Sequence, residues 1–229
     1  MTNLLIKENF VNELPWGTSL DPYIMNSMPE MVTWKPDGTV EFNVAAGKFK
    51  GWRMNERWQK YEWATDYANG MIVSKQQFLY GQFDLVCRLP YFKGSWPAFW
   101  FIDVTGKMGV PPEYDVFEQF IKDGTCKTRR QIQTTYHDGP TYTDDKQSFA
   151  VKKFTFPVSW SDVKISFIWT ADSMTTIING KTIMTVNKKD FLHFPNQPMN
   201  LILGSGVGNW EIDSAKFKPF IIKSLTYTN

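Results

Sequence analysis

The stretch MTTIINGKTIMTV (residues 174–186) shows most directly how this chain folds. Two short runs of Thr, Ile, Met and Val flank the pair Asn179-Gly180, and residues of these types favour pleated strands. Asn and Gly both tolerate positive φ, so the pair predicts a type I′ turn that joins the two runs. The stretch is therefore a β-hairpin, and similar runs recur along the chain.

Short alternating runs separated by turn signals cover most of the 229 residues. Apolar residues nowhere hold a helical period for long, apart from one helical turn expected at residues 188–192. Helices are too scarce to connect parallel strands, so we expect antiparallel sheets in an all-β sandwich or barrel. No repeat or linker divides the chain, which predicts a single domain over residues 1–229. The expected strands are residues 39–44, 71–74, 77–89, 98–103, 114–121, 131–136, 147–156, 163–170, 198–203 and 217–227.

Composition narrows the possible partners. Aromatic residues make up 16% of the chain, with 10 Trp, 18 Phe and 9 Tyr, which suits a β-rich core and also a sugar-binding cleft. The formal net charge is only +2, and the densest basic cluster, Lys127, Arg129 and Arg130, is interpreted as a solvated strand edge. We therefore expect no nucleic-acid partner.

The N-terminal residues and the two cysteines give limited information about localisation and disulfide bonding. Residues 1–8 lack the apolar stretch of a signal peptide, and no segment reaches the ~18 apolar residues of a membrane helix. We expect an extracellular protein, or one released by lysis or virion assembly, with no membrane partner. Cys87 and Cys126 could make at most one disulfide, and Cys87 shares a strand face with Phe83 and Leu85, which predicts a buried free thiol.

The most informative segment is PPEYDVFEQF (residues 111–120), in which three acids follow the pattern E-x-D-x-x-E. On a regular strand Glu113 and Asp115 share one face, whereas Glu118 points to the other, toward the core. An unsatisfied buried polar group costs roughly 2–7 kcal/mol. A β-bulge of one residue between Asp115 and Glu118 removes this conflict, so we expect all three acids to project from one face.

A row of acids suits glycosidic bond cleavage. A retaining enzyme needs two carboxyls about 5–5.5 Å apart, one as nucleophile and one as general acid. Crowding a third carboxyl between them raises at least one pKa, as a general acid near neutral pH requires. The spacing by itself fits an exposed acidic strand edge or a calcium site almost equally well.

The residues before the acids carry a family resemblance. YGQFDLVCRLP (residues 80–90), followed by KGSWPAFW (residues 93–100), is similar in order and spacing to the segment that precedes the acidic strand in glycoside hydrolase family 16. Weaker similarity extends over roughly residues 70–210, and the N-terminal third is only loosely recognisable. The segments that carry it are SKQQF (74–78), QTTYH (133–137), IWTAD (168–172), FPNQPMNLIL (194–203) and GVGNW (206–210).

The resemblance implies a jelly-roll β-sandwich like concanavalin A, with a sugar chain lying across the concave sheet. It also implies a retaining, endo-acting β-glycoside hydrolase that cleaves a β-linked polysaccharide or oligosaccharide. Position by position, Glu113 matches the nucleophile, Asp115 the supporting acid and Glu118 the general acid/base. The competing interpretations are a lectin-like carbohydrate-binding protein without hydrolysis and a transglycosylase.

Further site residues follow from the same resemblance. Trp96 and Trp100 match aromatic positions around the cleft, and Trp210, on a glycine-rich loop, is expected to contact substrate. His137 either orients Asp115 or is simply a satisfied polar residue, and His193 is taken as structural.

Several expectations concern cofactor, assembly and substrate. The chemistry needs no metal or other cofactor, and the strand at residues 220–227 lacks the acid with which many members bind a structural calcium. We expect a monomer. The motif resembles the laminarinase, agarase and carrageenase branches more than the lichenases, which usually lack its extra residue. Glucan and galactan substrates both remain open, and residues 52–66 and 138–146 are expected to be loops that decide between them.

Overall fold

The structure is a computed structural model that describes residues 1–12, 26–54, 59–103, 112–121, 129–138, 148–157, 162–208 and 212–229. Most of these residues lie in strands of two sheets. The first sheet contains β1 (Thr2–Asn3), β4 (Val32–Trp34), β5 (Val40–Phe42), β9 (Gly81–Arg88), β14 (Val163–Trp169), β15 (Ser173–Ile178), β16 (Lys181–Asn187) and β18 (Phe220–Thr228). The second contains β2 (Phe10–Val11), β8 (Met71–Phe78), β10 (Ser95–Ile102), β11 (Glu113–Glu118), β12 (Arg129–Asp138), β13 (Ser148–Pro157) and β17 (Met199–Val207).

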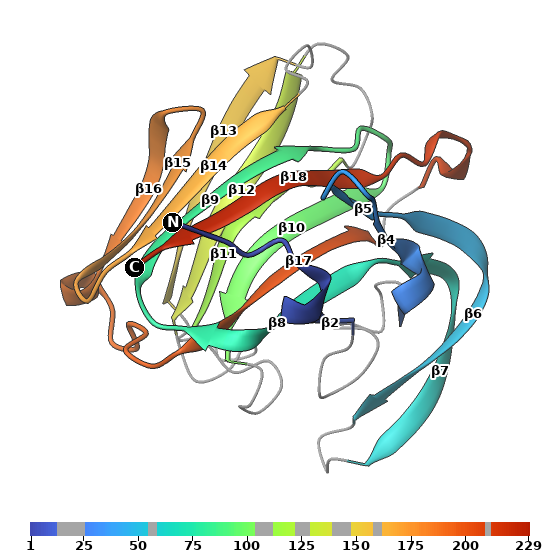
Figure 1. Cartoon of the computed structure of the whole chain (residues 1–229), viewed down its shortest axis with the longest axis horizontal. Helices are drawn as coiled ribbons and strands as arrows, with labels where there is room; N and C mark the ends of the chain where they lie inside the picture. Colours follow the sequence, from blue (N-terminus) through green and yellow to red (C-terminus); the bar gives the residue numbers. More distant parts are fainter. Residues whose placement is uncertain are drawn as a thin grey trace.

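The two sheets pack face to face as a sandwich (Figure 1). The first runs in the order β16-β15-β14-β9-β18-β5-β4, with β1 beside β18, and the second runs β13-β12-β11-β10-β17-β8-β2. All pairings within these two sheets are antiparallel. The predicted two-sheet antiparallel sandwich is therefore confirmed.

The hairpin predicted over residues 174–186 forms as expected. β15 and β16 pair antiparallel through Ser173↔Asn187 to Ile178↔Lys181. Asn179 has φ 48° and Gly180 has φ 79°, so both turn residues take the positive φ of a type I′ turn. A short 3-10 helix, Lys188–Asp190, lies within the range expected for a helical turn. In the described parts of the chain no helix is long and apolar enough to cross a bilayer.

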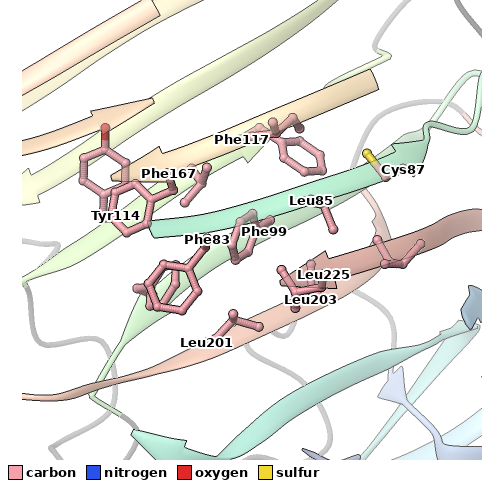
Figure 2. Close-up of a cluster of buried hydrophobic side chains, with 14 of the residues drawn as sticks. Phe83, Leu85, Cys87, Phe99, Tyr114, Phe117, Phe167, Leu201, Leu203 and Leu225 are labelled. Carbon is pink, nitrogen blue, oxygen red and sulfur yellow. The ribbon is translucent and has the colours of Figure 1, made fainter. Parts of the chain in front are cut away.

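The core fills the space between the sheets. Alternate residues of β9, namely Phe83, Leu85 and Cys87, point inward and are at most 1% exposed. They meet Phe99 and Phe101 from β10 and further apolar side chains of β14, β17 and β18 in one buried cluster (Figure 2). Cys87 is a buried free thiol, as predicted. Cys126 lies outside the described residues.

The predicted strand at residues 77–89 is wrong as a single element. The chain leaves β8 at Phe78 and begins β9 at Gly81, and these two strands belong to different sheets. Tyr80 (φ 65°) and Gly81 (φ 112°) make the corner. A Cβ at Gly81 would meet the Tyr227 ring at 2.4 Å, so glycine is required there both for its φ and for space.

The expectation of a loop at residues 52–66 is also wrong. Most of this range lies in β6 (Val44–Met54) and β7 (Lys60–Asn69), which pair as a long antiparallel hairpin that curves away from the sandwich (Figure 1). Many of its described side chains are exposed, so the hairpin lacks the apolar alternation that reveals a half-buried strand. β3 (Asn26–Ser27) adds one short parallel pairing to β7.

Candidate active site

Strand β11 carries the predicted β-bulge. Against β10, Phe117 pairs with Phe99 and Asp115 with Trp100, so Val116 is the extra residue that the partner strand does not match. The register with β12 shifts in the same place, between Asp115 and Glu118. The bulge was predicted from the spacing of the acids and is confirmed.

The bulge sends consecutive apolar side chains into the core. Tyr114, Val116 and Phe117 all belong to the main buried cluster with no exposed surface, and Figure 2 shows Tyr114 and Phe117 among the other core residues. The carbonyl of Val116 accepts a hydrogen bond from Thr134 Oγ1 at 2.9 Å, which satisfies a polar group that the interrupted ladder leaves inside. The opposite face is thereby left to the three acids.

Cross-strand neighbours place the acids on the outer face of the second sheet. Each of the three acids of β11 pairs with one residue on β10 and with one on β12, and paired residues point to the same face of the sheet. These neighbours are Ile102, Trp100 and Ala98 on β10 and His137, Thr135 and Gln133 on β12, in the same order.

An apolar floor adjoins the acids on this face. Trp100 is 7% exposed and packs with Ala98 and Ile102 of its own strand and with apolar side chains from β17 and β8. The remaining members of this cluster are Ile202, Met71 and Val73. Trp100 thus lies beside Asp115 on the same face, with most of its surface covered by neighbouring side chains, and its contact with substrate stays a prediction.

His137 contacts the central acid. Its Nε2 lies 3.1 Å from Asp115 Oδ2, and Asp115 is only 4% exposed. His137 is also the cross-strand partner of Glu113. The contact is one that orientation of Asp115 by His137 would require, and this role stays a prediction.

Trp96 contacts the last acid. Its indole Nε1 donates to Glu118 Oε1 at 2.9 Å, and its ring packs against Phe120 with centroids 5.1 Å apart. Trp96 lies on β10 two residues before Ala98, the partner of Glu118, so both side chains project from the same face. Trp96, one of the aromatic residues expected around the cleft, is therefore bonded to an acid of the site.

Burial and the closeness of the acids raise the pKa of two of the three carboxyl groups. Burial is the main cause that raises the pKa of Glu113 well above its ordinary value, followed by the charge of Asp115 and its hydrogen bond. Burial and then Asp115 likewise raise the pKa of Glu118, while the Trp96 hydrogen bond lowers it. The site therefore retains protons at pH values where isolated carboxyls are ionised, which suits acid–base chemistry.

His193 lies apart from the acids. Its Nδ1 is 2.9 Å from Asp138 Oδ1, and its backbone N–H donates to the same oxygen at 2.8 Å. Asp138 is 2% exposed at the end of β12, and Tyr136 OH donates to the His193 carbonyl. These contacts fasten the segment after β16 to β12, in agreement with the structural role expected for His193.

Some expected features lie outside the described residues, and one contact was not foreseen. Trp210 and residues 139–147 are outside the described ranges. Thr134 was missed as a support of the bulge, since nothing in its local sequence distinguishes it from Thr135. Within the described residues, no group of three or more His, Cys, Asp and Glu side chains is arranged to hold a metal ion.

Comparison with known proteins places the chain in a family. The model of glycosyl hydrolases family 16 matches residues 32–218, so the chain belongs to this family. It is 30% identical to endo-1,3-1,4-β-glycanase ExsH of Rhizobium meliloti over 115 residues, which are 47% of this chain and 23% of that protein. The chain thus spans only about a quarter of that relative's length.

Solved structures support the fold. A LamA variant from Z. galactanivorans, in complex with laminaritriose and laminaritetraose, superposes with a TM-score of 0.71 at 20% identity and covers 96% of this chain and 92% of that one. The κ-carrageenase of Pseudoalteromonas carrageenovora, with an oligotetrasaccharide of κ-carrageenan, gives 0.66 at 14% identity, over 96% and 87% of the two chains. At these identities the likeness establishes the common β-sandwich.

Proposed function

We propose that the protein is a retaining, endo-acting β-glycoside hydrolase that cleaves a β-linked polysaccharide by double displacement. The observation that carries the proposal is the bulge at Val116, because it brings Glu113, Asp115 and Glu118 onto one face of the sheet. Membership of a family of glycosyl hydrolases supports the same conclusion.

In the first step Glu113 is the nucleophile. Its ionised carboxylate attacks the anomeric carbon, the bond to the leaving oxygen breaks, and Glu118 gives its proton to that oxygen. The product of this step is a covalent glycosyl-enzyme. The raised pKa of Glu118 supports its role as the acid, because its proton is retained above the range in which an ordinary glutamate loses it.

In the second step Glu118 is the base. It removes a proton from water, the water oxygen attacks the anomeric carbon, and Glu113 departs as a carboxylate, which leaves the product in its original β configuration. Asp115 steadies Glu113 from the adjacent position on the same face, and Asp115 is itself bonded to His137. The cycle uses carboxyl groups and water alone, so the proposed chemistry requires no cofactor.

A β-glucan is the first substrate to test. The name of the Rhizobium relative points to a 1,3-1,4-linked glycan, and the LamA structure holds laminarin-type oligosaccharides. The κ-carrageenase likeness makes a galactan the second candidate. We further propose that the protein acts as a monomer and outside the cell that makes it, or after lysis or virion release, where such polymers are found.

The primary test is release of reducing ends from a panel of laminarin, mixed-linkage glucan, agar, carrageenan and mucin glycans. We expect medium-length products early in the reaction, with the new anomeric centre in the β form by proton NMR. Binding to a polymer without release would favour the lectin-like alternative. Products longer than the starting oligosaccharide, seen by mass spectrometry, would favour transglycosylation.

A second test identifies the nucleophile. A 2-deoxy-2-fluoro β-glycoside with a dinitrophenyl leaving group slows the second step and should trap the glycosyl-enzyme. We expect the added mass on the proteolytic peptide that contains Glu113. Labelling of a different residue would overturn the assignment of the nucleophile. If the protein is not labelled and its product has the inverted configuration, the double-displacement mechanism is wrong.

A further inference from the structure

The hydrogen bond between Trp96 and Glu118 has a chemical asymmetry. The indole Nε1–H can only donate, and it donates to Oε1 of Glu118 at 2.9 Å. An ionised carboxylate accepts this bond at either oxygen, whereas a protonated carboxyl carries its hydrogen on one oxygen. If that hydrogen were on Oε1, it would face the indole hydrogen and the bond would be lost.

We propose that Trp96 is a positioning residue that reserves Oε2 of Glu118 as the oxygen that gives up and takes back the proton. This inference rests on the proposed function, in which Glu118 is the general acid and base. In the first step the proton leaves Oε2 for the leaving oxygen of the sugar. In the second step Oε2 takes a proton from water, and Oε1 keeps the indole bond throughout.

Packing supports a fixed orientation for the indole. Trp96 lies inside strand β10, whose residues pair with β17 from Ser95↔Val207 to Ile102↔Asn200. The ring also packs against Phe120, which lies two residues beyond the end of β11. The donor is therefore held by the strand on one side and by a neighbouring ring on the other, so that orienting it costs little additional side-chain entropy.

The charges around Glu118 make a fixed donor useful. On its own strand, Asp115 opposes ionisation of Glu118, and Glu118 in turn raises the pKa of Glu113. β10, from Ser95 to Ile102, contributes no titratable side chain. The residue opposite Glu118 on β12 is the neutral Gln133.

Two groups that can carry a positive charge lie farther along this face in the part of the chain that the structure describes. His137 on β12 lies opposite Glu113 and contacts Asp115, and Lys153 on β13 is exposed and pairs with Gln133. The indole N–H is the group in direct contact with Glu118 that favours its ionised form. It thereby limits how far burial and Asp115 raise the pKa of Glu118, which must ionise before it can act as a base.

This role differs from contact with a sugar ring, which is the role expected for Trp96 as an aromatic residue around the cleft. A phenylalanine at position 96 keeps an aromatic face for the sugar and for Phe120 but has no N–H. Trp96→Phe therefore separates the two roles. Trp96→benzothienylalanine, in which sulfur replaces the N–H in a ring of almost the same shape, separates them again with minimal change in packing.

The experiment compares two substrates in the full-length protein. Cleavage of the polysaccharide needs a proton on the leaving oxygen, whereas a dinitrophenyl β-glycoside leaves without one. For both variants we expect kcat/KM on the polysaccharide to fall about tenfold, as for a lost hydrogen bond to a charged group, with the alkaline limb of its pH profile moved to higher pH. On the dinitrophenyl glycoside, kcat/KM should change by less than about twofold.

Two other results would contradict the role of Trp96 or that of Glu118. An equal loss on both substrates with an unmoved pH profile would overturn the inference and leave Trp96 as a structural or stacking residue. Glu118→Ala distinguishes this from failure of the proposed function, because an acid/base residue must show the same dependence on the leaving group when it is removed. If Glu118→Ala loses activity equally on both substrates, the assignment of Glu118 itself is wrong.

Discussion

Strands β9 and β11 are built on opposite plans. In β9 the inward residues Phe83, Leu85 and Cys87 alternate without interruption with outward residues such as Asp84. In β11 two consecutive residues enter the core, and the acids on either side of them emerge together. A regular strand keeps every second residue on one face, whereas the unpaired Val116 lets Asp115 and Glu118, three positions apart, share a face.

The partners of the acids differ in the same way. Asp84 on β9 accepts hydrogen bonds from Gln82 and from Ser166 on the adjacent strand, so its charge is satisfied by donors. The acids of β11 face one another, and only Trp96 and His137 donate to them among the side-chain contacts described above. Crowding of like charges is unfavourable for stability and is what proton transfer requires.

The sharpest test of this comparison exchanges one acid on each strand for its amide. Glu113→Gln should lower turnover of the polysaccharide by at least ~10³-fold while binding persists, as expected for loss of a covalent nucleophile. Asp84→Asn, the control on β9, should leave turnover unchanged. Equal turnover in Glu113→Gln and the wild type would remove Glu113 from the mechanism.

The next prediction concerns the support of the bulge. Thr134→Val keeps the size of the side chain but leaves the buried Val116 carbonyl without its donor, at a cost of about 1–3 kcal/mol in the free energy of unfolding. Urea denaturation measures this loss. Thr175→Val, which removes an exposed hydroxyl bonded to Thr185, should change stability by less than about 0.5 kcal/mol. If both variants unfold at the same midpoint, the Thr134 contact does not stabilise the bulge.

The two histidines provide a smaller contrast, since each contacts an aspartate. His137→Phe removes the donor to Asp115 and should lower kcat/KM about tenfold, in line with a hydrogen bond to a charged group. His193→Phe keeps the backbone N–H bond to Asp138 and should stay within about twofold of the wild type, as a surface change does. Similar losses in both variants would mean that His137 is no closer to the chemistry than His193.

The smallest expected effect is the pH dependence of stability. The pKa of Glu113 is raised in the folded state, so the folded protein binds protons more tightly than the unfolded chain, and stability is lost as pH rises above the ordinary value of 4.5. Glu113→Gln cannot ionise and should therefore raise Tm at pH 7, by about 2–4 °C for each kcal/mol gained. The difference should vanish near pH 4. A Tm gain that is the same at both pH values would exclude ionisation of Glu113 as its cause.

Much of the fold follows from local patterns in the sequence. The Asn179-Gly180 turn and the alternation in β9 depend only on neighbouring residues, and both were predicted correctly. The corner at Tyr80 was missed, because a non-glycine residue with positive φ is uncommon and the flanking residues all favour strands. The hairpin of β6 and β7 was missed because many of its described side chains are exposed, so its sequence shows no regular apolar alternation.

The features of the site also differ in how far the sequence could predict them. The spacing of Glu113, Asp115 and Glu118 predicts the bulge, because only a shift in phase avoids a buried acid. The contact of Thr134 with Val116 depends on the register between two strands, and the bond from Trp96 to Glu118 depends on the rotamers of both side chains. Neither can be deduced from a single segment, so contacts between strands were beyond the reach of the sequence.

The direction in which the three acids point depends on the number of residues between them and on whether each of these residues is paired, as the unpaired Val116 shows. Deleting Val116 together with its bulge would give the sequence EYDFE, in which strict alternation still places all three acids on one face and both aromatic residues in the core. On both partner strands the residues opposite Glu113 and Glu118 are four positions apart, Ile102 and Ala98 on β10 and His137 and Gln133 on β12. The bulge therefore absorbs the inserted residue, so that the two reacting groups keep both the direction and the span that an uninterrupted strand of this pattern would give them.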